Sequence, residues 1–402
     1  MITYNKQLKI QYNSIVLICL FVWSISSTLF MSTTLTSIAG LSCAVLYTAI
    51  WTLIRILLII KILIYTIYRM NELFMIVLLF AVSYLIGHNS GSYEMMTLVF
   101  FVIALRDIND IEIVKSILYA QVIGVIIVVI LALSGTIPNE VSFRASTSAI
   151  RYAMGFTHPN LFAAKILQIC LLYVYLRYHD LKKLDYVLLA IGMIITKIVT
   201  DSRTVSFLIM CLIVLLFITI HIRERPWLLK AGYRKILILK QIPLVVRGMI
   251  ISVVIFSIYA AIYYNYSDWL KYLNRLWSTR IQLMNAYYSA YKISLFGEHI
   301  VISNNPDVSY QYTVDNAYIY TIIRYGFVYL VLLIIGYMKL TKYASKQNNN
   351  ALLVIILIYT VYGLLETYFC RVSYNFTLLL FSQIIWSRKA VMQTENFKQI
   401  QV

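Results

Sequence analysis

Charged residues are scarce in this chain, and acidic residues are the scarcest. Of 402 residues, 16 are Asp or Glu and 34 are Lys or Arg, so charged residues make up 12% of the chain. Soluble domains carry roughly 25% charged and 45–50% apolar residues, whereas 61% of this chain is hydrophobic. This composition excludes an ordinary soluble domain. It predicts one all-α, polytopic integral membrane domain over residues 1–402.

Several enzyme motifs are also missing. The sequence contains no Gly-rich phosphate loop, no Gly-x-Ser-x-Gly elbow and no His-Glu-x-x-His pair, so it encodes no nucleotide energy source. The five cysteines lie in or beside apolar segments without metal-ligand spacing, and the histidines are scattered. We therefore expect neither a metal site nor a cofactor.

Apolar stretches of about 20 residues predict roughly a dozen membrane-spanning helices. They begin near Asn13, Leu35, Leu73, Tyr93, Ile113, Pro159, Leu184, Thr204, Gly248, Asn316, Ala351 and Arg371. With both termini in the cytoplasm, most basic residues fall in inward-facing segments, as the positive-inside bias requires. Two long loops, residues 134–157 and 264–315, then face outward. The net charge of +18 is explained by loops that face anionic lipid rather than by nucleic-acid binding.

Six arginines lie on the predicted outer side, where the positive-inside bias disfavours them. They are Arg144, Arg151, Arg203, Arg275, Arg280 and Arg371. An outward cluster of cations suits an anionic substrate, with a lipid-linked phosphate as the leading candidate. Phosphate binding is favoured for Arg203, because a cation in the first turn of a helix opposes the helix dipole.

The second outer loop contains an amphipathic stretch, from Trp269 to Ile293. Its apolar residues recur at helical spacing, which predicts one helix lying in the membrane interface. On such a continuous helix, Arg280 points into the apolar stripe and needs a counter-charge or a phosphate. The alternative is that Arg280 extends to lipid head groups.

Other polar residues at the predicted helix starts have a structural explanation beside a functional one. Pro159, with Thr157 or His158 as cap, makes a conventional helix start. His158 either makes a structural hydrogen bond or contacts substrate. Asp315 either caps the helix that follows or serves as a general base.

Three more charged or capping sites complete the set. Asp201 or Ser202 is expected to cap the next helix. Arg324, inside a predicted span, requires a partner or a water-filled cavity. Glu366 and Arg371 are expected to pair with each other.

Together these segments resemble a known family. The segments are Arg151…Gly155-Phe156-Thr157-His158-Pro159-Asn160, Asp201-Ser202-Arg203-Thr204, the loop with Arg275 and Arg280, Leu295-Phe296-Gly297, and Asp315-Asn316-x-Tyr318…Arg324-Tyr325-Gly326. Their order resembles that of the Wzy-type bacterial polysaccharide polymerases and the related O-antigen ligases. The resemblance implies a membrane-embedded, GT-C-like glycosyltransferase of the bacterial cytoplasmic membrane. Such an enzyme acts without a metal on oligosaccharide repeat units carried on undecaprenyl diphosphate, with a flippase and a chain-length regulator as candidate partners.

The resemblance also implies roles for individual residues. Asp315, Arg203 and Arg280 would be catalytic. The diphosphate would be bound by Arg151, Arg203, Arg275, Arg280 and Arg371, with support from His158, Asn160, Glu298, His299, Asn316 and Arg324. Two departures matter, because ligase relatives carry a catalytic His where this chain has Asp315, and often a second Gly where it has Glu298-His299. Either of these two residues is therefore an alternative base.

Two other functions remain open. A flippase or exporter of the same lipid-linked sugar would also have about a dozen spans and internal cations. Such a transporter would place its charges near the bilayer midplane, whereas here they gather at the outer rim. A ligase that joins finished glycan to another acceptor shares the same residues, and the sequence does not separate it from a polymerase.

Overall fold

The computed structural model describes residues 2–144, 148–224, 232–300 and 314–386. Eight helices in this part are long and apolar enough to cross a membrane, which indicates a polytopic membrane protein. They are α1 (Ile2–Met31), α2 (Cys43–Leu63), α3 (Met70–Ser90), α5 (Asp110–Leu133), α6 (Pro159–Arg177), α8 (Arg203–Glu224), α9 (Gly232–Tyr263) and α13 (Gly326–Lys346).

The other helices of the described chain are shorter. They are α4 (Glu94–Ala104), α7 (Lys183–Ile198), α10 (Asp268–Leu276), α11 (Arg280–Ala290), α12 (Ala317–Arg324), α14 (Asn350–Leu365), α15 (Phe381–Trp386) and the 3-10 helices η1 (Tyr178–Asp180), η3 (Tyr264–Tyr266), η5 (Thr367–Cys370) and η6 (Phe376–Leu378). The spans predicted from Tyr93, Leu184, Ala351 and Arg371 correspond to α4, α7, α14 and the η6–α15 pair. These are shorter than the roughly 20 residues that a span requires, so the dozen spans remain a prediction.

The strands of the described chain form two small hairpins. β1 (Ser37–Ile38) pairs with β2 (Leu41–Ser42), and β3 (Val141–Phe143) pairs with β4 (Ile150–Tyr152), both antiparallel. The hairpin β1–β2 occupies the start of the span predicted from Leu35. Helix α2 begins only at Cys43, where the Ser42 hydroxyl accepts a hydrogen bond from the amide of Val45 at 3.3 Å.

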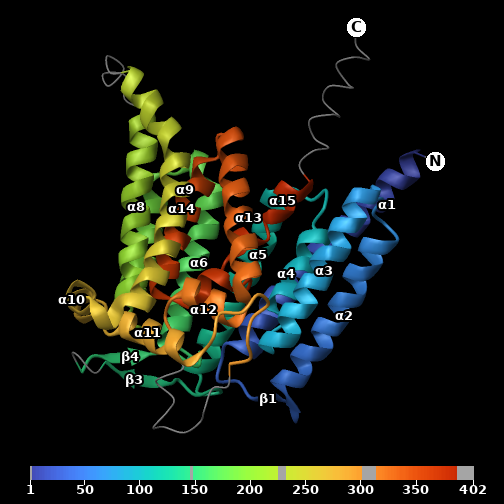
Figure 1. Cartoon of the computed structure of the whole chain (residues 1–402). Helices are drawn as coiled ribbons and strands as arrows, with labels where there is room; N and C mark the ends of the chain where they lie inside the picture. The colour runs from blue at the N-terminus through green and yellow to red at the C-terminus, as the bar shows by residue number, and fades with distance from the viewer. Residues whose placement is uncertain (1, 145–147, 225–231, 301–313, 387–402) are drawn as a thin grey trace.

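Both predicted outer loops lie at the same end of the helix bundle. The β3–β4 hairpin, α10 and α11 gather there, at the bottom of Figure 1, and the start of α1 lies at the opposite end. Residues 145–147 and 301–313 of these loops are outside the described residues. The arrangement places both loops opposite the N-terminal end of α1. Which end faces the cytoplasm remains a prediction.

The prediction of a single interfacial helix from Trp269 to Ile293 is wrong. This stretch is divided into α10 and α11 at Ser278 and Thr279, which take φ values of +53° and +67°. Asn274 holds this turn, because its carbonyl accepts from the amide of Thr279 at 3.0 Å and its side chain accepts from the amide of Gln282 at 2.9 Å. The helical-wheel argument for Arg280 therefore does not hold.

The span predicted from Asn316 is also interrupted. Gly326, at φ +88°, separates α12 from α13 and packs against Gly297, at φ +87°. The amide of Val328 donates to the carbonyl of Leu295 at 3.1 Å. Two separate sequence motifs, 295–297 and 324–326, are therefore in direct contact. Arg324 ends α12 and does not lie inside a spanning helix, which corrects the prediction.

This close contact predicts that Gly326→Ala is destabilising. A Cβ atom on Gly326 would lie 2.5 Å from the Leu295 carbonyl oxygen and closer still to the amide nitrogen of Gly297, in a backbone region that favours glycine. We expect a loss of about 3 kcal/mol, measured as a lower thermal midpoint of the purified protein in detergent. Gly248→Ala in α9, where the new atom has open space, is the matched control. Equal midpoints for the two variants would contradict this packing.

Candidate functional site

A polar cavity of about 520 Å³ is lined by residues of β4 and of the first turns of α8 and α11. Its lining brings together residues from distant parts of the sequence. They are Arg144, Arg151, His158, Asn160, Ser202, Arg203, Thr204, Phe207, Leu276, Trp277, Ser278, Arg280, Asp315, Leu365 and Glu366. Four of the six predicted outer arginines therefore share one cavity with two carboxyl groups.

Arg151 is fixed in place by its hairpin and by α6. It lies in β4, and its Nε donates to the carbonyl of Thr200 at 2.8 Å. One of its terminal nitrogens donates to the side-chain oxygen of Asn160, whose amide in turn donates to Glu366 at 3.1 Å. Burial, and repulsion from Arg144, lower the pKa of Arg151 below its ordinary value. No carboxylate neutralises this guanidinium directly within the described chain.

Asp201 stabilises the turn between α7 and α8. It takes a φ of +42° and receives hydrogen bonds at 2.6 Å from Arg144 and from Lys197. Burial alone would raise the pKa of Asp201, but these two cations hold it below the ordinary value. Of the two predicted caps of α8, Ser202 is the one used, since its hydroxyl accepts from the amide of Val205 at 3.4 Å.

Arg203 differs from its neighbours. It is the first residue of α8, is exposed and lines the cavity. Among the residues that the structure describes, its side chain has no hydrogen bond and no ion pair. A cation in the first turn of a helix, where backbone amides also point outward, is suited to binding an anion.

Arg280 is bound from three sides. Its guanidinium lies 3.1 Å from Glu366 Oε1, 3.4 Å from Asp315 Oδ2 and 3.4 Å from the Thr204 hydroxyl. The side chain of Arg280 is 18% exposed, that of Glu366 is 7% exposed and that of Asp315 is 43% exposed. The partly buried guanidinium thus finds its partners in the protein: Glu366 accepts its shorter hydrogen bond, and the carboxylate of Asp315 supplies a counter-charge. The expected pairing of Glu366 with Arg371 is wrong.

Asp315 is not the helix cap. Asn316 caps α12, because its side-chain oxygen accepts from the amides of Tyr318 and Ile319 at 3.0 and 2.9 Å. The Asn316 amide is also used, donating to Ser257 and to the carbonyl of Leu364. Asn316 is therefore a structural residue, and the carboxylate of Asp315 remains available to the cavity.

Glu366 is the site residue that sequence reasoning missed. Burial, and then repulsion from Asp315, raise its pKa to about 8, against the attraction of Arg280 and Arg151. The carboxyl group lies just beyond the last turn of α14. In the sequence, Glu366 is an acidic residue at a helix end, five residues before Arg371. That proximity suggested Arg371 as its partner, whereas the structure pairs Glu366 with Arg280.

His158 is the cap of α6, as predicted. Its Nδ1 accepts a hydrogen bond from the amide of Asn160 at 3.1 Å, and Pro159 occupies the first turn. Burial and the nearby Arg151 lower the pKa of His158. Both effects favour a neutral imidazole whose Nδ1 lone pair is engaged and whose Nε2 carries the hydrogen.

Besides Asn316, five predicted site residues lie outside this cavity. Arg275 is exposed on α10, and Arg324 and Arg371 lie beside Tyr320. Glu298 accepts a hydrogen bond from the amide of Lys292 at 3.1 Å. His299 lies near the carbonyl of Ser90, at 3.5 Å. The two alternative bases, Glu298 and His299, therefore do not face the cavity.

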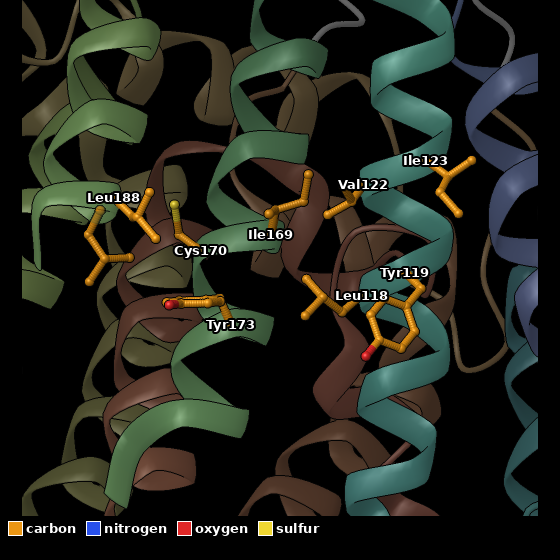
Figure 2. A pocket seen from close by; sticks show the side chains of 9 residues that line it. Leu118, Tyr119, Val122, Ile123, Ile169, Cys170, Tyr173 and Leu188 are labelled. Atoms are coloured by element: carbon orange, nitrogen blue, oxygen red, sulfur yellow. The ribbon is translucent and has the colours of Figure 1, made fainter. Parts of the chain in front are cut away.

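A second hollow, of about 340 Å³, has a different chemistry. It lies among α5, α6 and α7, and side chains such as Leu118, Val122, Ile169 and Leu188 line it (Figure 2). Its hydroxyl groups come from Tyr119 and Tyr173, and the latter bonds Asp185. This apolar hollow suits a hydrocarbon chain rather than a diphosphate.

Comparison of the chain with models of protein families, with curated proteins and with solved structures gave no match. The resemblance to polysaccharide polymerases therefore rests on the motifs alone. Within the described ranges, no three His, Cys, Asp or Glu side chains come together as metal ligands. Catalysis without a metal remains a prediction.

The raised pKa of Glu366 predicts a pH-dependent stability. Between its ordinary range and about pH 8, the folded protein holds a proton that the unfolded chain releases, so stability falls as the pH rises through this window. Glu366→Gln, which cannot ionise, should match wild type near about pH 4 and have a higher thermal midpoint from about pH 6 upward, with the difference growing until about pH 8. Asp268→Asn, at a carboxylate that is 98% exposed, should follow wild type throughout. A Glu366→Gln midpoint parallel to wild type across this range would contradict the buried, proton-binding carboxyl.

Proposed function

We propose that this protein joins lipid-diphosphate-linked oligosaccharide units into a polysaccharide by glycosyl transfer at the outer face of a bacterial cytoplasmic membrane. The observation that carries the proposal is one cavity lined both by Arg203, which has no partner among the described residues, and by the half-exposed carboxylate of Asp315. A cationic pocket beside a carboxylate suits a reaction in which an anionic group leaves and a hydroxyl loses its proton.

The charge distribution supports a diphosphate ligand. Arg144 is neutralised by Asp201, and Arg280 is paired with Asp315 and bonded to Glu366. Arg151 and Arg203 keep their charge for a ligand. Guanidinium groups bind phosphate oxygens in a bidentate manner, and such charge-assisted hydrogen bonds are roughly twice as strong as neutral ones.

The proposed reaction is a displacement at the anomeric carbon of the donor. The hydroxyl oxygen of the acceptor sugar attacks that carbon, and the bond from carbon to the diphosphate oxygen breaks. The electron pair leaves with the lipid diphosphate, which Arg203 and Arg151 stabilise as its charge increases. The hydroxyl proton passes to Asp315 and then to water. No nucleotide is needed, because the diphosphate is itself the leaving group.

Substitutions of Arg203 test the diphosphate contact. We expect Arg203→Gln to reduce polymer formation by roughly 10²–10³-fold. Arg203→Lys should still lose about tenfold, because an ammonium group does not reproduce bidentate contact. Polymer is measured as a ladder of glycan lengths in a host that supplies the lipid-linked unit. Lys271→Gln, which removes an exposed cation of α10 at the same end, should leave the ladder intact. Normal ladders from both Arg203 variants would refute the assignment.

Asp315→Asn tests the base and separates the enzyme from a flippase. The amide keeps the shape of the carboxylate but cannot accept the proton, so we expect a loss of roughly 10²–10⁴-fold. Single lipid-linked units should then accumulate on the outer leaflet. Units that are trapped on the inner leaflet would instead identify a flippase, and the proposed chemistry would fail.

A further inference from the structure

Two arginines that lie outside the cavity form a second cationic cluster. The Cζ atom of Arg324 is 5.7 Å from the ring centroid of Tyr320, and that of Arg371 is 5.9 Å from the same centroid. Arg371 also lies 5.8 Å from the ring of Tyr368. Such cation–π contacts orient the two guanidiniums, but they do not neutralise their charges.

Neither guanidinium has a bonded counter-charge. Among the described residues, Arg324 and Arg371 form no ion pair and no side-chain hydrogen bond, and the Nε atom of each is buried without a partner. The acid that acts on both is Glu94, the first residue of α4, whose carboxylate lies 3.5 Å from the Tyr325 hydroxyl. Glu94 supplies one negative charge, whereas Arg324 and Arg371 supply two positive charges, so the cluster has a net positive charge. Burying a charge that has no partner is energetically costly.

The cluster and the cavity share the elements that carry them. Asp315, in the cavity, lies two residues before the start of α12, whereas Tyr320 and Arg324 lie five and nine residues further on. Glu366 precedes η5 and faces the cavity, and Arg371 follows η5 and faces the cluster. At about 1.5 Å per residue in an α-helix and about 2 Å in a 3-10 helix, the two sites lie on the order of 10 Å apart.

We propose that Arg324 and Arg371, with Tyr320 between them, form a second diphosphate site. Resting on the proposed function, this site holds the lipid diphosphate of the acceptor unit, while the cavity with Arg203 holds that of the donor. A polymerase must hold two such lipids at the same membrane surface, and two adjacent cationic sites meet that need. Glu94 offsets one of the two guanidinium charges, so the cluster keeps a net positive charge, which attracts a multiply charged anion more strongly than a singly charged one.

Binding stoichiometry tests this proposal. The purified full-length chain is placed in phosphatidylcholine nanodiscs and titrated with farnesyl diphosphate, and bound ligands are counted by native mass spectrometry. Wild type should bind two equivalents. Arg324→Gln combined with Arg371→Gln should weaken one of them by at least about tenfold and keep the other, whereas Arg203→Gln should weaken only the other. A single equivalent in wild type, or two in the double variant, overturns the second site.

A variant that is expected to bind more tightly keeps the proposal testable even if the double variant does not fold. Glu94→Gln removes the repelling carboxylate and keeps its shape, so the second equivalent should bind roughly tenfold tighter and the first should be unchanged. Unchanged affinity for both equivalents would refute the role of this cluster. Nanodiscs that also contain phosphatidylglycerol should give the same two equivalents. Loss of the second there would assign the cluster to ordinary anionic lipid head groups and overturn the proposal.

Kinetics separate this inference from the proposed function. In a transfer assay, the double variant should raise the KM for the acceptor by at least about tenfold and leave the KM for the donor near wild type. Equal effects on both KM values would overturn the second site while leaving the polymerase proposal intact. If wild type formed no polymer, the proposed function would be refuted. The second binding site would still be supported in that case if wild type bound two equivalents of diphosphate.

Discussion

The guanidinium of Arg280 reaches three other parts of the chain: Thr204 at the start of α8, Asp315 before α12 and Glu366 after α14. It thereby connects the helices that surround the cavity. It also gives the buried carboxyl group of Glu366 a hydrogen-bond donor, so that this polar group is not left without a partner. The positions of Asp315 and Glu366 relative to each other depend on this one side chain.

The same interaction sets the charge that the cavity offers to a ligand. Arg280 is bonded to Asp315 and Glu366, Arg144 is paired with Asp201, and Arg151 is bonded to Asn160, which carries no charge. Arg203 alone among the four cavity arginines has no partner in the described chain. The three bonded arginines hold the walls of the cavity in place, and Arg203 is left to bind a ligand. Electrostatic stabilisation of a leaving group uses cationic groups that are held in position in this way.

Much of this could be predicted from local sequence. Long apolar runs predicted the eight helices that are long and apolar enough to span a membrane, and Pro159 with His158 predicted the start of α6. These predictions succeed because hydropathy and capping depend on residues within a few positions of one another.

The remainder depends on contacts between distant residues. Adjacent Asp315 and Asn316 are both good caps, and the sequence does not say which of them has the backbone conformation that caps α12. The break at Gly326 requires Gly297, which lies far away in the chain, and the turn at Thr279 requires Asn274. The short helix η5 separates Glu366 from Arg371, so the nearest cation in sequence is not the nearest in space.

The most direct test of this account is reconstitution of the purified chain in proteoliposomes with one lipid-linked repeat unit as the only added substrate. Lengthened glycans and free lipid diphosphate are then quantified together. The account predicts one lipid diphosphate released for each unit joined, without added nucleotide. Movement of intact units across the bilayer, with no lengthened glycan and no released diphosphate, would contradict it.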